Sequence, residues 1–455
     1  MMTTQHREHW QNLEALLRGA DPAGLHRYLG TLPPGETARA IFRLAREDQE
    51  RLLTVLSPQQ AAGLVVELPQ AQAAELLGAV PPDRAAAILG CLPSDERADL
   101  LGELDTERAG TILANLPSEV AEDVRRLAQY PPETAGGLMI TEYLAYPESA
   151  RVEDIIADLR GHAEQYSRYQ VQYAYITSLA GRLVGVLRLR DLLLSPTEAA
   201  VTSVMVTEPL RLRAEAPLDE LARFFDRHPF FGAPVTDEEG RLLGVVLQAD
   251  VEEALGERAE RRFLLISGVL GGEEFRTMSW RVRLGRRLAW LGISLALNLL
   301  AAGVIGLYQE TLAAVIALAV FLPVISGMGG NSGNQALAVS VRELALGLIQ
   351  PHEFRWVLLK EAAVGVVNGL LLGALLGVLA LVWVGNPYLG LVVGAAMTLS
   401  TLVAVCLGGT LPLALSRLGL DPAVAAGPIL TTVTDTCGFF FTLALASGLL
   451  HQLAL

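Results

Sequence analysis

The sequence predicts a multidomain protein with four parts: an acidic all-α solenoid (1–130), an α/β tandem (137–258), a linker helix (259–287) and an α-helical membrane domain with five spans (288–455). Three observations predict this order: a leucine repeat with a period of twelve residues, two similar α/β segments 59 residues apart, and a series of long hydrophobic runs near the end. Charged residues make up only 18% of the 455 residues, against about 25% in soluble domains. Part of the chain is therefore expected to lie in a membrane.

Charge is unevenly distributed along the chain. Only six of the 49 acidic residues and four of the 35 basic residues fall after position 287. The preceding part is acidic, which argues against a nucleic-acid partner, since such proteins present a basic face. Cys91, Cys406 and Cys437 lie far apart, so they predict neither a disulfide framework nor a zinc site, as expected in a reducing compartment.

The first nineteen residues are polar and amphipathic and lack the apolar core of a signal peptide. We therefore expect the solenoid and the α/β tandem to stay in the cytosol. The solenoid itself is predicted from apolar residues that recur every twelve positions, and several of them are followed by a proline, which the first turn of a helix tolerates. Each unit should form one short helix and a turn, and the units should stack as a scaffold or docking surface. The recurring residues are Leu32, Leu44, Leu56, Leu68, Val80, Leu92, Leu104 and Leu116.

The α/β tandem contains two copies of the same motif. Gly-Arg-Leu segments begin at Gly181 and Gly240, and each is expected to close a hairpin before a β-branched strand. Asp191 and Asp250 follow these strands, where we expect each to cap a helix. The tandem resembles a pair of CBS domains, regulatory modules that often bind adenine nucleotides. By position in these motifs, the resemblance implies nucleotide contacts at Tyr173, Arg190, Asp191 and Phe230.

The membrane domain is predicted from five hydrophobic runs, each long enough to cross a hydrocarbon core, which needs about 20 residues. Arginines precede the first run and lie in the loops after the second and fourth, whereas the other two loops carry no positive charge. The positive-inside rule then places the N-terminus in the cytoplasm and the C-terminus outside. The runs cover residues 288–308, 312–341, 361–384, 388–415 and 423–450.

Asp435 stands near the middle of the last run. A carboxylate there costs about 2.5–3.5 kcal/mol, so we expect it to face a pore, a partner or a cavity. The alternative is a protonated aspartate that hydrogen-bonds between helices. In the second run, Asn331, Asn334 and Gln335 offer neutral amides that suit a hydrated ion, and the alternative for this segment is a glycine-rich packing seam.

Oxygen ligands point to a hard cation such as Mg²⁺ or Ca²⁺, because the membrane domain has no cluster of cysteine, histidine and methionine for a softer metal. A homodimer would place two copies of Asp435 on its axis. The membrane motifs are Gly330-Asn-Ser-Gly-Asn-Gln335 and Asp421-Pro-Ala followed by Pro428, Asp435 and Gly438. With the order of parts, they resemble the MgtE magnesium transporter/channel family over essentially the whole chain.

This resemblance implies a homodimer in the lipid of the cell membrane, with a central pore and Asp435 as its acid. It also implies that Mg²⁺ bound between acidic faces of the solenoid and the CBS domains closes the pore through the linker (plug) helix, and some members bind ATP at the CBS pair. The regulatory candidates are Asp250, Glu253, Asp95 and Asp99, and solvated surface charge is the alternative for the last two.

Three arginines, Arg258, Arg261 and Arg262, interrupt the acidic run after Asp250. Since they compete with Mg²⁺ for the carboxylates, we expect weaker gating by Mg²⁺. Two other functions stay open: a CBS-regulated exporter of another divalent cation, and a membrane nucleotide sensor that transports nothing. Selectivity among Mg²⁺, Ca²⁺, Mn²⁺ and Co²⁺ also stays open, as does the choice between channel and carrier. No phosphate-binding loop, nucleophile elbow or metal triad is present in the sequence, so no enzyme is predicted.

Overall fold

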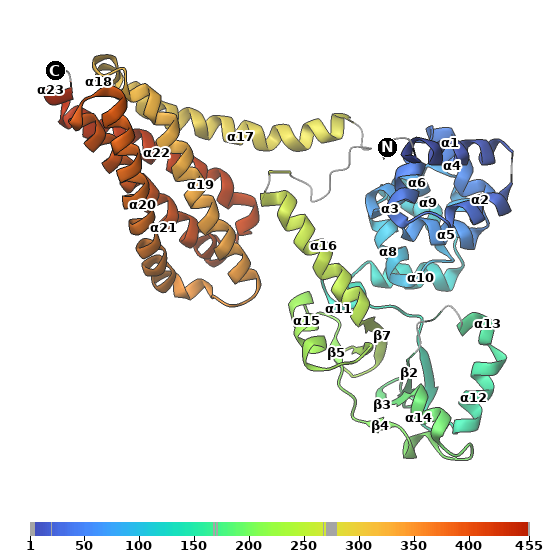
Figure 1. Ribbon diagram of the computed structural model, residues 1–455. Coiled ribbons are helices and arrows are strands. Elements are labelled where there is room, and N and C mark those ends of the chain that lie inside the picture. Colours follow the sequence, from blue (N-terminus) through green and yellow to red (C-terminus); the bar gives the residue numbers. More distant parts are fainter. Residues whose placement is uncertain are drawn as a thin grey trace. The chain divides into compact units, whose positions relative to one another are not determined.

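The computed structural model describes residues 5–453 apart from 20, 167–168, 170–171, 267 and 270–279. The chain forms two compact units, Met1–Gly256 and Glu257–Leu455. Figure 1 shows short helices and two small sheets in the first unit and long helices in the second.

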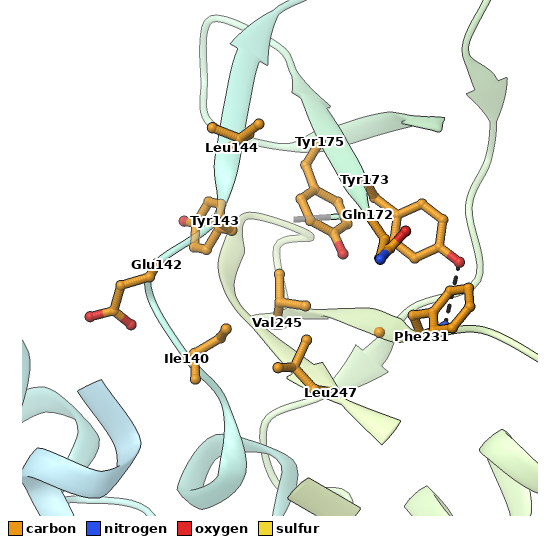
Figure 2. A pocket seen from close by; sticks show the side chains of 11 residues that line it. Ile140, Glu142, Tyr143, Leu144, Gln172, Tyr173, Tyr175, Phe231, Val245 and Leu247 are labelled. Carbon is orange, nitrogen blue, oxygen red and sulfur yellow. Dashed lines mark hydrogen bonds between the residues drawn. The ribbon is translucent and has the colours of Figure 1, made fainter. Parts of the chain in front are cut away.

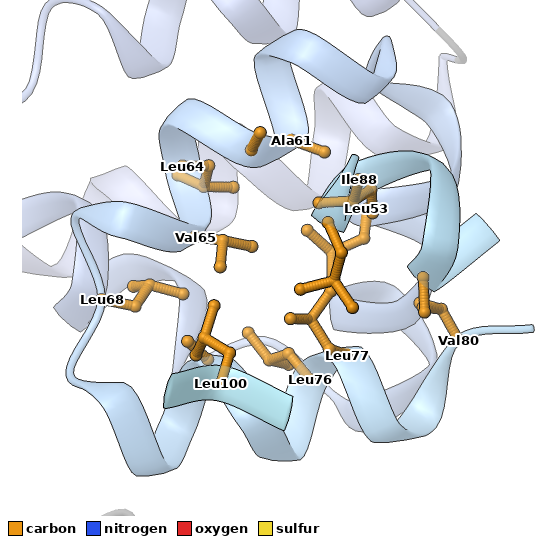
Figure 3. Close-up of a cluster of buried hydrophobic side chains, with 14 of the residues drawn as sticks. Leu53, Ala61, Leu64, Val65, Leu68, Leu76, Leu77, Val80, Ile88 and Leu100 are labelled. Carbon is orange, nitrogen blue, oxygen red and sulfur yellow. The ribbon is translucent and has the colours of Figure 1, made fainter. Parts of the chain in front are cut away.

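The first unit begins with the predicted solenoid of short helices. Its core consists of the repeat leucines and of apolar residues at helical spacing, such as Val65, Leu77 and Ile88 (Figure 3). The helices are α1 (Gln5–Arg18), α2 (Pro22–Leu29), α3 (Pro34–Ile41), α4 (Arg46–Val55), α5 (Pro58–Val66), α6 (Gln70–Ala79), α7 (Pro82–Leu89), α8 (Ser94–Gly102), α9 (Thr106–Leu113) and α10 (Ser118–Leu127). Most of the repeat residues follow a helix end and are buried, which confirms the predicted solenoid.

Arginines satisfy the carbonyl groups at the ends of these helices. Arg84 Nε donates to Leu53 O at 2.9 Å, and Arg97, which is only 6% exposed, donates to Leu89 O at 2.9 Å and Leu92 O at 2.6 Å. The last four carbonyl groups of a helix have no partner within it. A stack of short helices has many such ends, so these arginine side chains lower the free-energy cost of leaving carbonyl groups unpaired.

Two sheets form the α/β tandem, and they share one topology. In the first, β1 pairs parallel with β2, and β2 pairs antiparallel with β3; β5, β6 and β7 repeat this arrangement. The first copy contains β1 (Leu144–Pro147), α12 (Val152–Gly161), α13 (Ala163–Tyr166), β2 (Tyr173–Thr177), β3 (Leu183–Arg188), α14 (Leu189–Leu194) and β4 (Val206–Thr207). The second contains β5 (Leu212–Arg213), α15 (Leu218–Arg227), β6 (Gly232–Thr236), β7 (Leu242–Leu247) and α16 (Gln248–Ile266), and α11 (Ala135–Leu138) precedes both.

The two copies contact each other through equivalent backbone groups. Leu183 N donates to Gly240 O at 2.9 Å, and Leu242 N donates to Gly181 O at 3.1 Å. Gly181 and Gly240 have φ of +74° and +81°, a conformation that favours glycine in a hairpin turn. The predicted duplication is therefore confirmed, and the copies are related by an approximate two-fold axis.

The expected helix caps at Asp191 and Asp250 are wrong. The structure starts α14 at Leu189 and α16 at Gln248, directly after strands β3 and β7. Because each strand continues into its helix without an intervening turn, both aspartates lie in the first helical turn. An acid in that turn still interacts favourably with the helix N-terminus.

The second unit contains a helical bundle, whose helices run from yellow (α17) through orange to red in Figure 1. Helix α21 packs against α19, α20 and α22. The elements are α17 (Trp280–Leu307), α18 (Gln309–Ala314), α19 (Leu318–Ala345), α20 (Phe354–Val384), α21 (Pro387–Arg417), α22 (Pro422–Gly448) and α23 (Leu450–Leu453).

Four helices in the described part of the chain are long and apolar enough to cross a membrane: α17, α20, α21 and α22. Helix α19 has a similar length, but it contains the polar segment Gly327–Gln335 and falls outside this set. The hydrophobic run expected at 312–341 is divided between α18 and α19. The linker expected at 259–287 falls on the end of α16 and the start of α17, and residues 267 and 270–279 lie outside the described residues.

Glycines hold α20 and α21 together. Gly365, Gly369, Gly373 and Gly377 recur every four residues on one face of α20 and meet the backbone of α21. A Cβ on Gly373 would lie 2.5 Å from Gly394 O. Because lipid provides no hydrophobic driving force between helices, such close approach is a main source of their association.

We expect the substitution Gly373→Ala to lower the thermal stability of the detergent-solubilised protein by several degrees, because the added methyl group collides with the α21 backbone. Gly303→Ala in α17 is the control, since a Cβ there meets nothing within 4 Å. The measurement is thermal unfolding followed by tryptophan fluorescence. Equal melting temperatures for the two variants would contradict the role of the glycine row.

Candidate functional site

Asp435 lies on α22 and faces α19. Its carboxylate is partly buried, and its Oδ1 atom accepts a hydrogen bond from Ser326 Oγ of α19. One turn later, a Cβ on Gly438 would lie 3.3 Å from Ser326 Cα, so the two helices approach closely at this level. Ser326 was missed by the sequence analysis, although it is a polar residue in the apolar part of α19, directly before the glycine-rich segment.

The glycine-rich segment of α19 has two different faces. Gly329 and Gly333 pack inward, where an added Cβ would lie 2.9 Å from Ser400 Oγ and 3.0 Å from Ala404 O. Asn331, Asn334 and Gln335 are exposed on the single chain. The packing seam therefore occupies one face of the helix and the amide groups another, where their contact with a hydrated ion stays a prediction.

A polar cleft of about 240 Å³ lies between α17, α19 and α22. Asn334 lines it together with Ser294 and Asn298 of α17, and Thr431 and Thr432 of α22 complete its polar lining. These threonines stand one turn before Asp435. Asn298 was also missed, and its signal was an amide inside an otherwise apolar span.

The first unit brings together two acids that the sequence analysis named separately. Asp95 lies in the first turn of α8 and Asp250 in the first turn of α16, and their charges interact. Burial is the main cause that raises the pKa of Asp95 to about 6 and the pKa of Asp250 to about 7. Asp95 Oδ1 and Asp250 Oδ2 are buried without a hydrogen-bond partner among the described residues.

Solvated surface charge, the alternative raised for Asp95, is therefore wrong for this residue. Glu253 is exposed, and its charge contributes to the raised pKa of Asp250. Asp99 lies partly buried on the next turn of α8. Within the described residues, no group of three or more histidine, cysteine, aspartate or glutamate side chains is arranged to hold a metal ion.

Glu142 connects the solenoid to the segment that precedes β1. Its Oε2 atom accepts hydrogen bonds from Ser94 Oγ at 2.7 Å and Ser94 N at 3.2 Å, and Arg97 Nη2 lies 3.7 Å from Oε1. This carboxylate also adds to the raised pKa of Asp95. The sequence analysis missed Glu142, because nothing in the local sequence marks a contact with a residue 48 positions away.

Figure 2 shows a small cavity between the two copies of the α/β tandem. Tyr173 lines it, and its hydroxyl oxygen accepts a hydrogen bond from Phe231 N at 3.4 Å. Phe231, rather than the expected Phe230, lines the cavity, and Phe230 packs on Phe224 and His228.

The remaining nucleotide candidates, Arg190 and Asp191, pair with each other at 3.3 Å and do not line the cavity. The cavity volume is about 20 Å³, which is room for about one water molecule. A nucleotide does not fit in this cavity in the present conformation, and of the four expected residues only Tyr173 lines it.

Three family models match the chain. The description "Divalent cation transporter" covers residues 322–445, "MgtE intracellular N domain" covers 32–133 and "CBS domain" covers 201–257. These matches fall on the bundle, the solenoid and the second copy of the α/β tandem.

Characterised relatives match over most of the chain. The magnesium transporter MgtE of Thermus thermophilus is 35% identical over 330 residues, 72% of this chain and 73% of the relative. Its namesake in Bacillus subtilis is 30% identical over 72% of each chain. The crystal structure of the soluble part of a magnesium transporter matches 56% of this chain and 99% of its own, with 25% identity and a TM-score of 0.50. The chain therefore belongs to the MgtE family of magnesium transporters.

Proposed function

We propose that this chain is a Mg²⁺-selective channel or transporter for magnesium uptake, gated by its cytosolic unit. The observation that carries the proposal is the Asp435 carboxylate on α22, which faces α19, the helix that also carries the amides Asn331 and Asn334. Placing an acid inside a membrane is energetically unfavourable, and such residues typically mark an ion path. Family membership supports Mg²⁺ as the ion, because the relatives are magnesium transporters.

The surroundings of Asp435 suit a cation that keeps its water. Mg²⁺ gives up its water shell reluctantly and is usually held by one or two carboxylates with several waters in place. The neighbouring 240 Å³ cleft begins one turn before Asp435, and its amides and hydroxyls, such as Asn298, Asn334 and Thr431, would hydrogen-bond to those waters without binding the ion too tightly. Asp435 then supplies the negative charge that favours a cation over an anion.

The proposed assembly is a homodimer, with the N-terminus in the cytoplasm and the C-terminus outside. Asn331, Asn334 and Gln335 are exposed on the single chain, and exposed amides at bilayer depth are costly in contact with lipid. A second copy of the chain facing this surface would enclose them in a hydrated pore. Two copies of Asp435 would then match the charge of one divalent cation.

The proposed regulatory site uses Asp95 and Asp250. Each of these two carboxylates has one buried oxygen without a hydrogen-bond partner among the described residues. When both carboxylates are ionised, their repulsion destabilises the contact between α8 and α16. Mg²⁺ fits these oxygens, because carboxylate oxygen is its preferred protein ligand. Cytosolic Mg²⁺ would thereby strengthen this contact, with Glu253 and Asp99 adding to the local field.

Two alternatives are less well supported. An exporter of another divalent cation would use the same acid, and transport assays with Ca²⁺, Mn²⁺ and Co²⁺ would distinguish it. A nucleotide sensor that transports nothing leaves Asp435 without a role. ATP binding at the tandem stays a prediction, because it requires the 20 Å³ cavity beside Tyr173 to open.

We expect Asp435→Asn to reduce Mg²⁺ uptake into proteoliposomes at least tenfold under an inside-negative potential, because the variant loses the charge that attracts the cation. Glu310→Gln removes one charge from the exposed surface of α18 and should leave uptake unchanged. Uptake is measured with a Mg²⁺-sensitive dye inside the vesicles. Equal rates for the native chain and Asp435→Asn would refute the proposed ion path.

The acid pair predicts a pH dependence. Because the pKa of Asp250 is raised from 3.8 to about 7 on folding, the folded state binds its proton more tightly, so stability falls as pH rises from about 4 through 7. In Mg²⁺-free buffer, hydrogen exchange in α8 and α16 of the full-length protein, corrected for its intrinsic pH dependence, should therefore accelerate toward pH 8. Asp250→Asn should reduce this acceleration, and Asp226→Asn, an exposed acid on α15, should not.

The three arginines after Asp250 predict weak gating by Mg²⁺. We expect physiological Mg²⁺ to give only partial protection of the cytosolic unit against trypsin. Replacing Arg258, Arg261 and Arg262 by glutamine should increase the protection that Mg²⁺ gives. This second comparison uses chymotrypsin for both the native chain and the variant, because the substitutions remove cleavage sites for trypsin. Complete protection of the native chain at physiological Mg²⁺ would contradict the weak-gating hypothesis.

A further inference from the structure

We infer that Ser326 is a positioning residue for the pore carboxylate, an inference that rests on the proposed role of Asp435. Ser326 Oγ donates to Asp435 Oδ1 across the contact between α19 and α22. This bond fixes the carboxylate through one oxygen and assigns the other, Oδ2, to the water shell of the cation.

The choice of hydrogen-bond partner supports this role. A serine or threonine within a helix commonly bonds to the carbonyl group four residues earlier. Ser332 on α19 does so to Met328 O at 2.9 Å, and Thr436 on α22 does so to Thr432 O at 2.6 Å. Ser326 bonds instead to a side chain 109 residues away on another helix.

The backbones of α19 and α22 lie close enough for a side chain as short as serine to reach the Asp435 carboxylate. A Cβ on Gly438 would lie 3.3 Å from Ser326 Cα and 3.4 Å from Ser326 N, so any larger residue there would push α22 away from α19. Ser326 itself is only 7% exposed, so little water competes for its hydroxyl group. A hydrogen bond to an ionised partner in such surroundings contributes more than one between neutral groups.

The orientation of one carboxylate oxygen matters for how tightly the hydrated cation is held, rather than for whether a path exists. Removal of the hydroxyl frees the Asp435 side chain to sample other rotamers, so fewer molecules present Oδ2 correctly at any moment. The concentration of Mg²⁺ that gives half-maximal uptake should then rise, while the maximal rate changes little.

The test compares Ser326→Ala with Ser400→Ala in full-length protein reconstituted in liposomes. Ser400 is a matched control: it is fully buried on the neighbouring α21, it lies beside Gly329, and its Oγ atom has no hydrogen-bond partner among the described residues. We expect Ser326→Ala to raise the half-saturating Mg²⁺ concentration roughly ten- to hundredfold, the range for a lost hydrogen bond to a charged group. Ser400→Ala should leave it unchanged, and Ser326→Thr, which keeps the hydroxyl, should restore most of the affinity.

Size-exclusion profiles and melting temperatures identify any variant that fails to fold, and Ser326→Thr then supplies the comparison. A native half-saturation value in Ser326→Ala, while Asp435→Asn loses uptake, would overturn the inference and leave the proposed function intact. An equal fall in maximal rate in both Ser326 variants, without a change in half-saturation, would show a packing role and overturn it as well. Native uptake by Asp435→Asn would instead refute the proposed function itself.

Discussion

The organisation of the membrane unit depends on one constraint: a polar group inside a bilayer must find its partner within the protein or in enclosed water. Asp435 is such a group, and Ser326 supplies one of its hydrogen bonds. That contact exists only because Gly438 lets α22 approach the backbone of α19. Glycines of α19 and α20 likewise allow close approach to α21, and buried apolar side chains such as Phe321 and Val393 fill the rest of the bundle.

The same physical problem recurs in the first unit with a different solution. Asp95 and Asp250 are acids whose burial raises their pKa, and each has an oxygen without a partner among the described residues. Close to them, Glu142 is also largely withdrawn from water, but it is satisfied by Ser94 and Arg97. A permanent contact and an unsatisfied pair thus lie side by side at the first turn of α8. The first holds the solenoid to the neighbouring segment, and we propose that the second makes the contact with α16 sensitive to protons and divalent cations.

Residues on one element serve separate purposes on its different faces. On α19, Gly329 and Gly333 pack against α21 and α22, while Asn331 and Asn334 stay available for water or an ion. This division explains why the glycine-rich sequence was equally consistent with packing and with transport. A helix with 3.6 residues per turn places neighbours in the sequence on different faces, so both properties are encoded in one short segment.

The sequence by itself determined the order of the parts, because their signals are local and periodic. The twelve-residue repeat predicted the short helices, the copies 59 residues apart predicted the paired sheets, and an acid within an apolar run identified Asp435. The tertiary structure alone decided which distant residues meet: Ser326 with Asp435, Glu142 with Ser94, and Asp95 with Asp250. It also decided that Phe231 rather than Phe230 lines the cavity and that Asp191 lies inside its helix rather than at the cap. These outcomes depend on contacts between elements far apart in the chain and on where a strand gives way to a helix, and neither leaves a periodic pattern in the local sequence.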